Sequence, residues 1–354
     1  MRFYNHAHQF YVGIDLHARQ MYVCVIDGDG KTRFHRNMPT DADHLQRALQ
    51  PFGSDLVLAV ECVFSWYWVA DFCADHSIGF VLGHALYMKA IHGAKSKNDK
   101  IDSRKIATML RGGLLPMAYV YPKHMRSTRD LLRRRQYFMH HHSELLTHIQ
   151  NTNTQYNLAP FPKRLHYAAN RIDIQHQFSD DSIRTSIEAD LDLLDHFHRI
   201  ILDIEAQVKR QAKHHDPKAL YLLRTVPGIG PILSLLILYE IHDIRRFPSV
   251  GNFISYARLV KCAHESAGKR VKGGHNKIGN AHLKWAFSEA AVLFLRGNEP
   301  AKRLQQRLVS RYGKAKALSL IAKKLGTTVY FMLKRSEPFD PERFFSDDTH
   351  ELKA

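Results

Sequence analysis

The sequence of 354 residues is short of cysteine, of acidic side chains and of long apolar runs. Its cysteines, Cys24, Cys62, Cys73 and Cys262, have neither the paired spacing of a zinc site nor the density of a disulfide-rich protein. The longest apolar run, PILSLLILY, is far too short to span a bilayer, and MRFYNHAHQFYVGID has no apolar core of a signal peptide. We therefore expect a cytosolic protein with reduced thiols and no membrane partner.

Basic residues are abundant by contrast. Lys and Arg outnumber Asp and Glu by 51 to 34, which gives a net charge of +17 with 24 histidines counted as neutral. Such a surface attracts polyanions, and the excess is clustered along the chain rather than spread evenly. Nucleic acid is the expected partner, and the plain alternative is that the charge only keeps the protein soluble. With 45% hydrophobic residues, the chain can bury cores for two or three domains.

The N-terminal third has the pattern of an α/β domain. The stretch FYVGIDLHARQMYVCVIDGDGKTRFHRNM contains three apolar runs and a DGDGK turn, which predicts a β-meander. A polar helix over 41–52, a buried strand DLVLAVE, an aromatic helix SWYWVADFCADH and an apolar strand FVLG follow. This order predicts an RNase H-like α/β domain. Actin-like kinases and ATPases also begin with a strand like YVGIDLH, but here His17 replaces their glycine and no second phosphate loop is evident.

Four carboxylates fall where such a domain would bring them together. Asp15 lies on the first strand and Glu61 ends the fourth, while Asp99 and Asp102 are three positions apart in the helical stretch KNDKIDSRKIA. Carboxylates gathered at one end of a sheet repel one another, whereas Mg²⁺ or Mn²⁺ takes oxygen ligands and supplies the missing charge. Two such ions can hold the attacking and leaving oxygens of a phosphodiester. The alternatives are that Asp99 and Asp102 only stabilise a helix N-terminus, and that His17 beside the strand end is a structural residue.

The pattern of polar and apolar residues changes twice in the remaining chain. From about residue 126, long polar-apolar stretches predict the two arms of a helical hairpin, with a basic face and an apolar face that fit a coiled-coil arm facing RNA or DNA. A third pattern begins near residue 216 and predicts an all-α domain. The expected organisation is an RNase H-like α/β domain (1–125), a helical arm (126–215), a C-terminal domain (216–335) and an acidic tail (336–354).

Two motifs of the C-terminal domain point to a nucleic-acid backbone. VPGIGPILS has the pattern of a helix-hairpin-helix, in which Gly228 and Gly230 permit a tight turn whose N–H groups can face a phosphate. A packing corner between two helices is the alternative. Downstream, small residues from Ser266 onward open a loop that contains no acid before residue 284. Its basic residues are Lys269, Arg270, Lys272, Lys277 and Lys284. Here the alternative is a phosphate-contacting loop with an incidental serine.

As a set, these blocks resemble the DEDD-type insertion-sequence transposases, a family with a RuvC-like N-terminal domain and a C-terminal domain bearing a serine, which includes a pilin-gene invertase. The residues that carry the resemblance are VGIDLH, AVECVFSWYWVADF, KNDKIDSRKIA, VPGIGPILS and ESAGKRVKGGHNKIGNAHLKWAFSEAA, in the family's order. One position departs from the family, because Ala267 stands where most members have the first glycine of Ser-Gly-Gly.

The resemblance implies a transposase that cuts and rejoins DNA. It implies that Asp15, Glu61, Asp99 and Asp102 bind Mg²⁺ (or Mn²⁺) and that Ser266 forms a covalent phosphoserine link to DNA. It further implies a noncoding bridge RNA that pairs with donor and target DNA, dimers that assemble into a tetramer, and a place near the bacterial nucleoid. Two alternatives stay open: a metal-dependent junction nuclease without a covalent serine step, and a noncatalytic nucleic-acid-binding protein.

Overall fold

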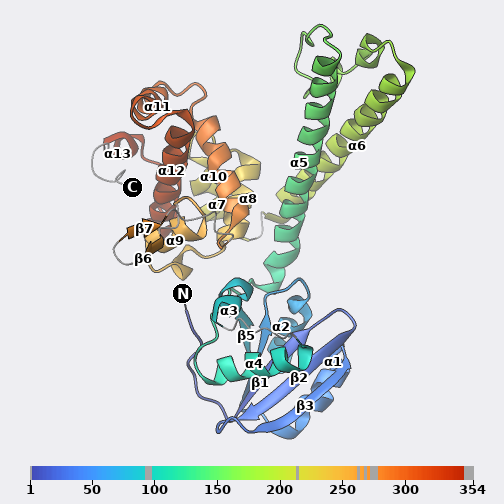
Figure 1. Cartoon of the computed structure of the whole chain (residues 1–354). Helices are drawn as coiled ribbons and strands as arrows, with labels where there is room; N and C mark the ends of the chain where they lie inside the picture. Colours follow the sequence, from blue (N-terminus) through green and yellow to red (C-terminus); the bar gives the residue numbers. More distant parts are fainter. Residues whose placement is uncertain are drawn as a thin grey trace. The chain divides into compact units, whose positions relative to one another are not determined.

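The computed structural model divides the chain into two compact units, Met1–His124 and Met125–Ala354 (Figure 1). The first unit contains a mixed sheet, and the described part of the second is mostly helical, which agrees with the α/β plus α class. The finer division into four parts stays a prediction. The residues that the structure describes are 2–91, 98–212, 215–260, 264–266, 269–271 and 278–346.

The first unit is built on a five-stranded sheet with the order β3-β2-β1-β4-β5. β1 pairs antiparallel with β2 and parallel with β4, so β1 joins an antiparallel meander to a parallel half. The predicted meander is confirmed, and the order is consistent with an RNase H-like domain. The strands are β1 (Phe10–Leu16), β2 (Gln20–Asp27), β3 (Thr32–Pro39), β4 (Leu56–Glu61) and β5 (Gly79–Gly83).

Helices cover both faces of this sheet because successive side chains of a strand point to opposite sides. Val12 and Ile14 of β1 pack in one core with α1 and α2, whereas Tyr11 packs in the other with α3 and α4. Three of these helices match predicted ones, and the short helix α3 was not expected from the sequence. Their bounds are α1 (Ala42–Leu49), α2 (Trp66–Asp75), α3 (Ala85–Ile91) and α4 (Asp99–Arg111).

Helix α4 lies directly against β1 because residue 13 is glycine. A Cβ atom on Gly13 would lie 2.3 Å from the backbone nitrogen of Ala107 and 2.3 Å from the carbonyl oxygen of Ser103. The ring of His35 on β3 adds a second tie, with Nε2 at 2.9 Å from the carbonyl oxygen of Lys100. These contacts fix the first turns of α4 over the sheet.

The second unit begins with two long antiparallel helices, α5 (Lys123–Gln155) and α6 (Asp181–Ala212). Figure 1 shows them side by side, and the contacts agree: Arg135 donates to Glu205 at 2.8 Å, and the rings of Phe138 and Phe197 are 5.7 Å apart. Towards the connection between the helices, Ile149 and Ile187 share a separate apolar core with residues of that connection.

The rest of the second unit shares one apolar core, to which α8 (Pro231–Ile241) contributes residues that are all buried from Leu233 onward. The other helices of this core are α7 (Pro217–Arg224), α9 (Val250–Tyr256), α10 (Ala281–Phe294), α11 (Glu299–Tyr312), α12 (Lys314–Arg335) and α13 (Pro341–Ser346). A short hairpin of β6 (His264–Ser266) and β7 (Lys269–Val271) precedes α10. Among the described helices, none has both the length and the apolar character needed to cross a membrane.

Candidate metal centre and nucleic-acid interface

Two of the predicted acids lie on neighbouring strands at the same edge of the sheet. Ile14 of β1 is in register with Val60 of β4, so the next residues, Asp15 and Glu61, lie beside each other at the carboxyl ends of parallel strands. Asp15 has the same parity as Gly13, and its side chain therefore leaves the sheet on the face that α4 covers.

The other two acids lie in the first turn of α4. Asn98 caps this helix by accepting a hydrogen bond from the Lys100 backbone nitrogen at 3.0 Å, so Asp99 is the first helical residue and Asp102 follows one turn later on the same face. Acids at a helix N-terminus are favoured by the macrodipole. Lys105 donates to Asp102 at 3.2 Å, which leaves Asp99 as the more exposed carboxylate of the two.

His17 completes this cluster. Its Nε2 lies 3.5 Å from Oδ2 of Asp15 and 3.7 Å from Oδ1 of Asp99. Burial raises the pKa of the Asp15 carboxyl; His17 opposes the increase, and the charges of Asp99 and Asp102 add to it. A positive charge close to Asp15 would stabilise the ionised form of its carboxyl group.

The residues present fit a divalent cation. In the described part of the chain, Asp15, His17 and Asp99 each offer a ligand atom, and these atoms lie within 4.8 Å of one another. Two of the four predicted acids thus share this set with a histidine. The strand register places Glu61 next to this set. Asp102 is close enough for its charge to raise the pKa of Asp15.

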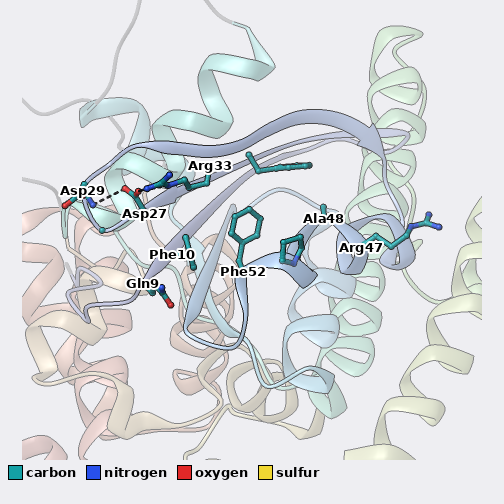
Figure 2. Close-up of a pocket in the computed structure, with 11 residues that line it drawn as sticks. Gln9, Phe10, Asp27, Asp29, Arg33, Arg47, Ala48 and Phe52 are labelled. Carbon is teal, nitrogen blue, oxygen red and sulfur yellow. Dashed lines mark hydrogen bonds and ion pairs between the residues drawn. The ribbon is translucent and has the colours of Figure 1, made fainter.

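The first unit also has a pocket of about 760 Å³ (Figure 2). It lies at the start of β1, whereas Asp15 and the candidate metal centre are near the end of that strand. Phe10 and Phe52 line it with ring centroids 5.1 Å apart, and Arg33 on its wall is bound to Asp27 at 2.6 Å. Phe10 pairs with Asp27, whereas Asp15 is near the other end of the same ladder. None of the predicted acids lines this pocket, so it is separate from the candidate centre.

The predicted serine and basic residues lie in the second unit. Ser266 is the last residue of β6 and is paired with Lys269 at the start of β7, where Arg270 follows. Lys284 is exposed in the first turn of α10. Lys272 and Lys277 lie outside the described residues. The paired strands β6 and β7 and the start of α10 thus carry Ser266 and three of the predicted cations.

The glycines of VPGIGP form the predicted turn between α7 and α8. Gly228 has φ +84, and a Cβ atom there would lie 2.5 Å from the backbone nitrogen of Phe294 on α10. Gly230 is the N-cap of α8, with Pro231 at the first helical position and open space around its Cα. Close packing on α10 therefore accounts for the glycine at position 228, and phosphate contact by this turn stays a prediction.

Sequence reasoning missed a buried ionic network in the same unit. Glu240 on α8 is fully buried and accepts hydrogen bonds from Arg129 and Arg133 of α5. The amide of Asn280 donates to the same carboxylate at 2.7 Å, while its Oδ1 caps α10 through the Leu283 backbone nitrogen. The available signal was one carboxylate inside the most apolar stretch, PILSLLILYEI, since a buried charge needs partners.

Sequence comparisons relate the chain to known transposases. A family model for the DEDD-type transposase of the IS110 group matches residues 12–158, and a model described as the transposase IS116/IS110/IS902 family matches residues 220–306. The pilin gene-inverting protein of Moraxella bovis is 29% identical over 168 residues, which cover 46% of this chain and 49% of that protein. The protein of the same name from Moraxella lacunata matches to the same extent. The aligned part thus spans about half the length of these relatives.

The first match contains the strands and the helix that carry the predicted acids, and the second lies wholly in the helical unit, so the two models of this family reach both units of the chain. The chain belongs to the IS110 transposase family.

Proposed function

We propose that the protein is an insertion-sequence transposase that cuts and rejoins DNA with a divalent-metal centre and a serine nucleophile, guided by a bridge RNA. The observation that supports it most is the meeting of Asp15 and Asp99, from β1 and α4, at the end of the sheet where β4 delivers Glu61. Its place of action would be the bacterial cytoplasm near the nucleoid.

The acids would hold the metal. Asp15, Glu61, Asp99 and Asp102 supply carboxylate oxygens, which are the donors that Mg²⁺ and Mn²⁺ take. When bound, a divalent ion supplies the positive charge that neutralises these acids and stabilises negative charge developing on a phosphodiester. The protein contributes by fixing the ligands, because α4 is fastened to β1 at Gly13 and to β3 through His35.

Ser266 would supply the attacking oxygen. Its hydroxyl oxygen would bond to phosphorus, the sugar oxygen of the cleaved strand would leave, and the proton of the serine would pass to solvent. The resulting phosphoserine link conserves the energy of the phosphodiester, so a free DNA hydroxyl can later attack it and release the serine. The cations around Ser266 would hold the DNA or RNA backbone, with Gly228 and Gly230 in the same role.

Denaturing electrophoresis with labelled donor DNA and copurified RNA tests the proposal. Wild type should give a protein-DNA adduct that maps to Ser266 in the presence of Mg²⁺. Ser266→Ala should bind DNA, RNA and metal but form no adduct. Asp102→Asn should also form none while keeping its thermal stability.

Three results would count against the proposal in different ways. An adduct that persists in Ser266→Ala would refute the serine assignment. DNA cleavage without an adduct would favour a junction nuclease, and no cleavage under any metal would favour a noncatalytic binding protein. Sequencing of RNA that copurifies with the protein, together with light scattering of the complex, tests the bridge RNA and the dimer-to-tetramer assembly.

A further inference from the structure

His17 has its fold-stabilising contacts in its backbone rather than in its ring. Its backbone nitrogen donates to the carbonyl oxygen of Gln20 at 3.1 Å, and its carbonyl oxygen accepts from Oγ1 of Thr40 at 2.9 Å. These bonds close the turn between β1 and β2 whatever the side chain is. The side chain itself is 56% exposed, so the fold gains little from burying it.

The ring nevertheless has a defined direction. Residue 17 lies just beyond the end of β1, and its ring is on the α4 side because Nε2 approaches both Asp15 of β1 and Asp99 of α4. The distances of 3.5 Å to Asp15 and 3.7 Å to Asp99 exceed the usual N–H···O hydrogen bond of about 2.7–3.2 Å. Two ligand atoms that share one ion, each about 2.0–2.2 Å from it, lie about 3–4 Å apart, which is the separation seen here.

We propose that His17 is a nitrogen ligand of the divalent ion held by Asp15 and Asp99, and that it makes this site select Mn²⁺ over Mg²⁺. The inference rests on the metal centre of the proposed function and adds the identity of one ligand and of the ion. Mg²⁺ is a hard cation that prefers oxygen donors, whereas affinity for sites with an imidazole rises from Mn²⁺ along the first transition series. Because the side chain is 56% exposed and the residue is held through its backbone, the ring can adjust to an ion without strain in the fold.

Neighbouring charges support a site with more than one negative ligand. Asp102 lies one turn along α4, and its carboxylate is held by Lys105 at 3.2 Å, so it is partly neutralised before any ion binds. Asp99 and Asp15 make their closest described charge contacts with His17. His17 as a ligand leaves these two carboxylates to balance the ion.

The experiment uses the full chain and Mn²⁺ alone as the probe. Electron paramagnetic resonance measures the affinity for Mn²⁺, and electron spin-echo modulation detects coupling of the bound ion to ¹⁴N. Wild type should show this coupling, and chain labelled with ¹⁵N-histidine should replace it with a ¹⁵N signal, which identifies the ligand as a histidine. His17→Gln should lose the coupling and at least about tenfold in Mn²⁺ affinity, since loss of even an outer partner of a metal ligand costs about 10–100-fold. Its Mg²⁺ affinity, measured by competition, should change less than about threefold.

His44→Gln is the matched control, because His44 pairs with Asp41 at 2.7 Å on α1 and lies on the other face of the sheet. It should leave both the coupling and the affinity unchanged. Bound Mn²⁺ without nitrogen coupling in wild type would overturn the inference but leave the acid site in place. Absence of Mn²⁺ binding, with Asp15→Asn identical to wild type, would overturn the metal centre and the inference together.

Discussion

The fully buried carboxylate of Glu240 accepts a hydrogen bond from Nε of Arg133 at 2.6 Å. Burial alone would raise the pKa of Glu240, but the hydrogen bond from Arg133 and the charges of Arg129 and Arg133 outweigh it and lower the pKa to about 2. Because Glu240 lies on α8 and both arginines on α5, this pair ties the first long helix to the centre of the helical core. Asn280 extends the tie to the start of α10, next to the segment that carries Ser266.

Loss of the Glu240 charge should therefore destabilise the second unit strongly. Glu240→Gln keeps the shape but leaves the buried guanidinium of Arg129 and the partly buried one of Arg133 beside a neutral amide, and we expect a cost of about 3–5 kcal/mol in urea unfolding. Glu299→Gln is the control, because Glu299 accepts from Lys302 at 2.6 Å on the exposed start of α11. Solvent screens that exposed pair, so its loss should change the unfolding free energy far less than loss of the Glu240 charge. Equal losses in the two variants would contradict the role given to the network.

The same carboxylate predicts a pH dependence in acid. Its pKa is depressed in the folded chain, so its contribution to stability is fully present above about pH 4.5 and is lost as the pH falls towards about 2. The difference in unfolding free energy between wild type and Glu240→Gln should thus narrow between pH 5 and about pH 3. A constant difference over that range would show that the charge is not what stabilises the fold.

His142 on α5 predicts a second pH effect, at milder acidity. Burial, together with the positive charges of His166 and Arg171, lowers the pKa of His142 to about 4, and its Nδ1 has no hydrogen-bond partner in the described structure. Protonation then favours the unfolded chain, so stability falls as the pH drops from about 6.5 to about 4, with a loss of about 2 kcal/mol between pH 7 and pH 5. Thermal unfolding of His142→Phe should lack this loss, whereas His148→Phe, with an exposed ring on the same helix, should retain it.

Gly13 should couple the packing of α4 to metal binding. In Gly13→Ala the new Cβ atom meets the backbone of α4, which cannot yield as a flexible side chain can, and we expect about 1–3 kcal/mol of destabilisation. The displaced helix would also carry Asp99 away from Asp15, so Mn²⁺ affinity and DNA cleavage should fall together. Gly28→Ala has open space around it and should change stability by less than about 0.5 kcal/mol. Normal metal binding in Gly13→Ala would show that α4 is not held by this contact.

The basic segment after Ser266 should account for much of the salt dependence of DNA binding. Each phosphate contact contributes about 0.9 to the slope of log K against log salt, so neutralising Lys269, Arg270 and Lys272 together should reduce it by about two to three units. Fluorescence anisotropy at several salt concentrations gives the slope. The control variant removes three exposed cations of α11, namely Lys302, Arg303 and Arg307. An unchanged slope in the first variant would place the phosphate contacts elsewhere.

The sequence by itself determined the local order of the first unit and the positions of its four acids. Apolar runs define β1 and β2, the DGDGK turn joins the next strand, and Asn98 with Asp99 starts α4, because these signals depend on neighbours in the chain. The resemblance of five short blocks likewise identified the family. Neither the local signals nor the resemblance depends on which elements are in contact.

Tertiary structure alone decided which of these residues meet. His17 reads as a structural residue until the strand register and the contact at Gly13 bring α4 over its ring. The pattern around Gly228 predicts a phosphate-binding turn, whereas the structure shows that α10 packs directly against this glycine. The partners of Glu240 are arginines 107 and 111 positions earlier in the chain, which no local pattern indicates. Side chains distant in sequence interact only after the backbone has brought them together. A pattern of period two or 3.6 describes one strand or helix and does not indicate which other elements pack against it.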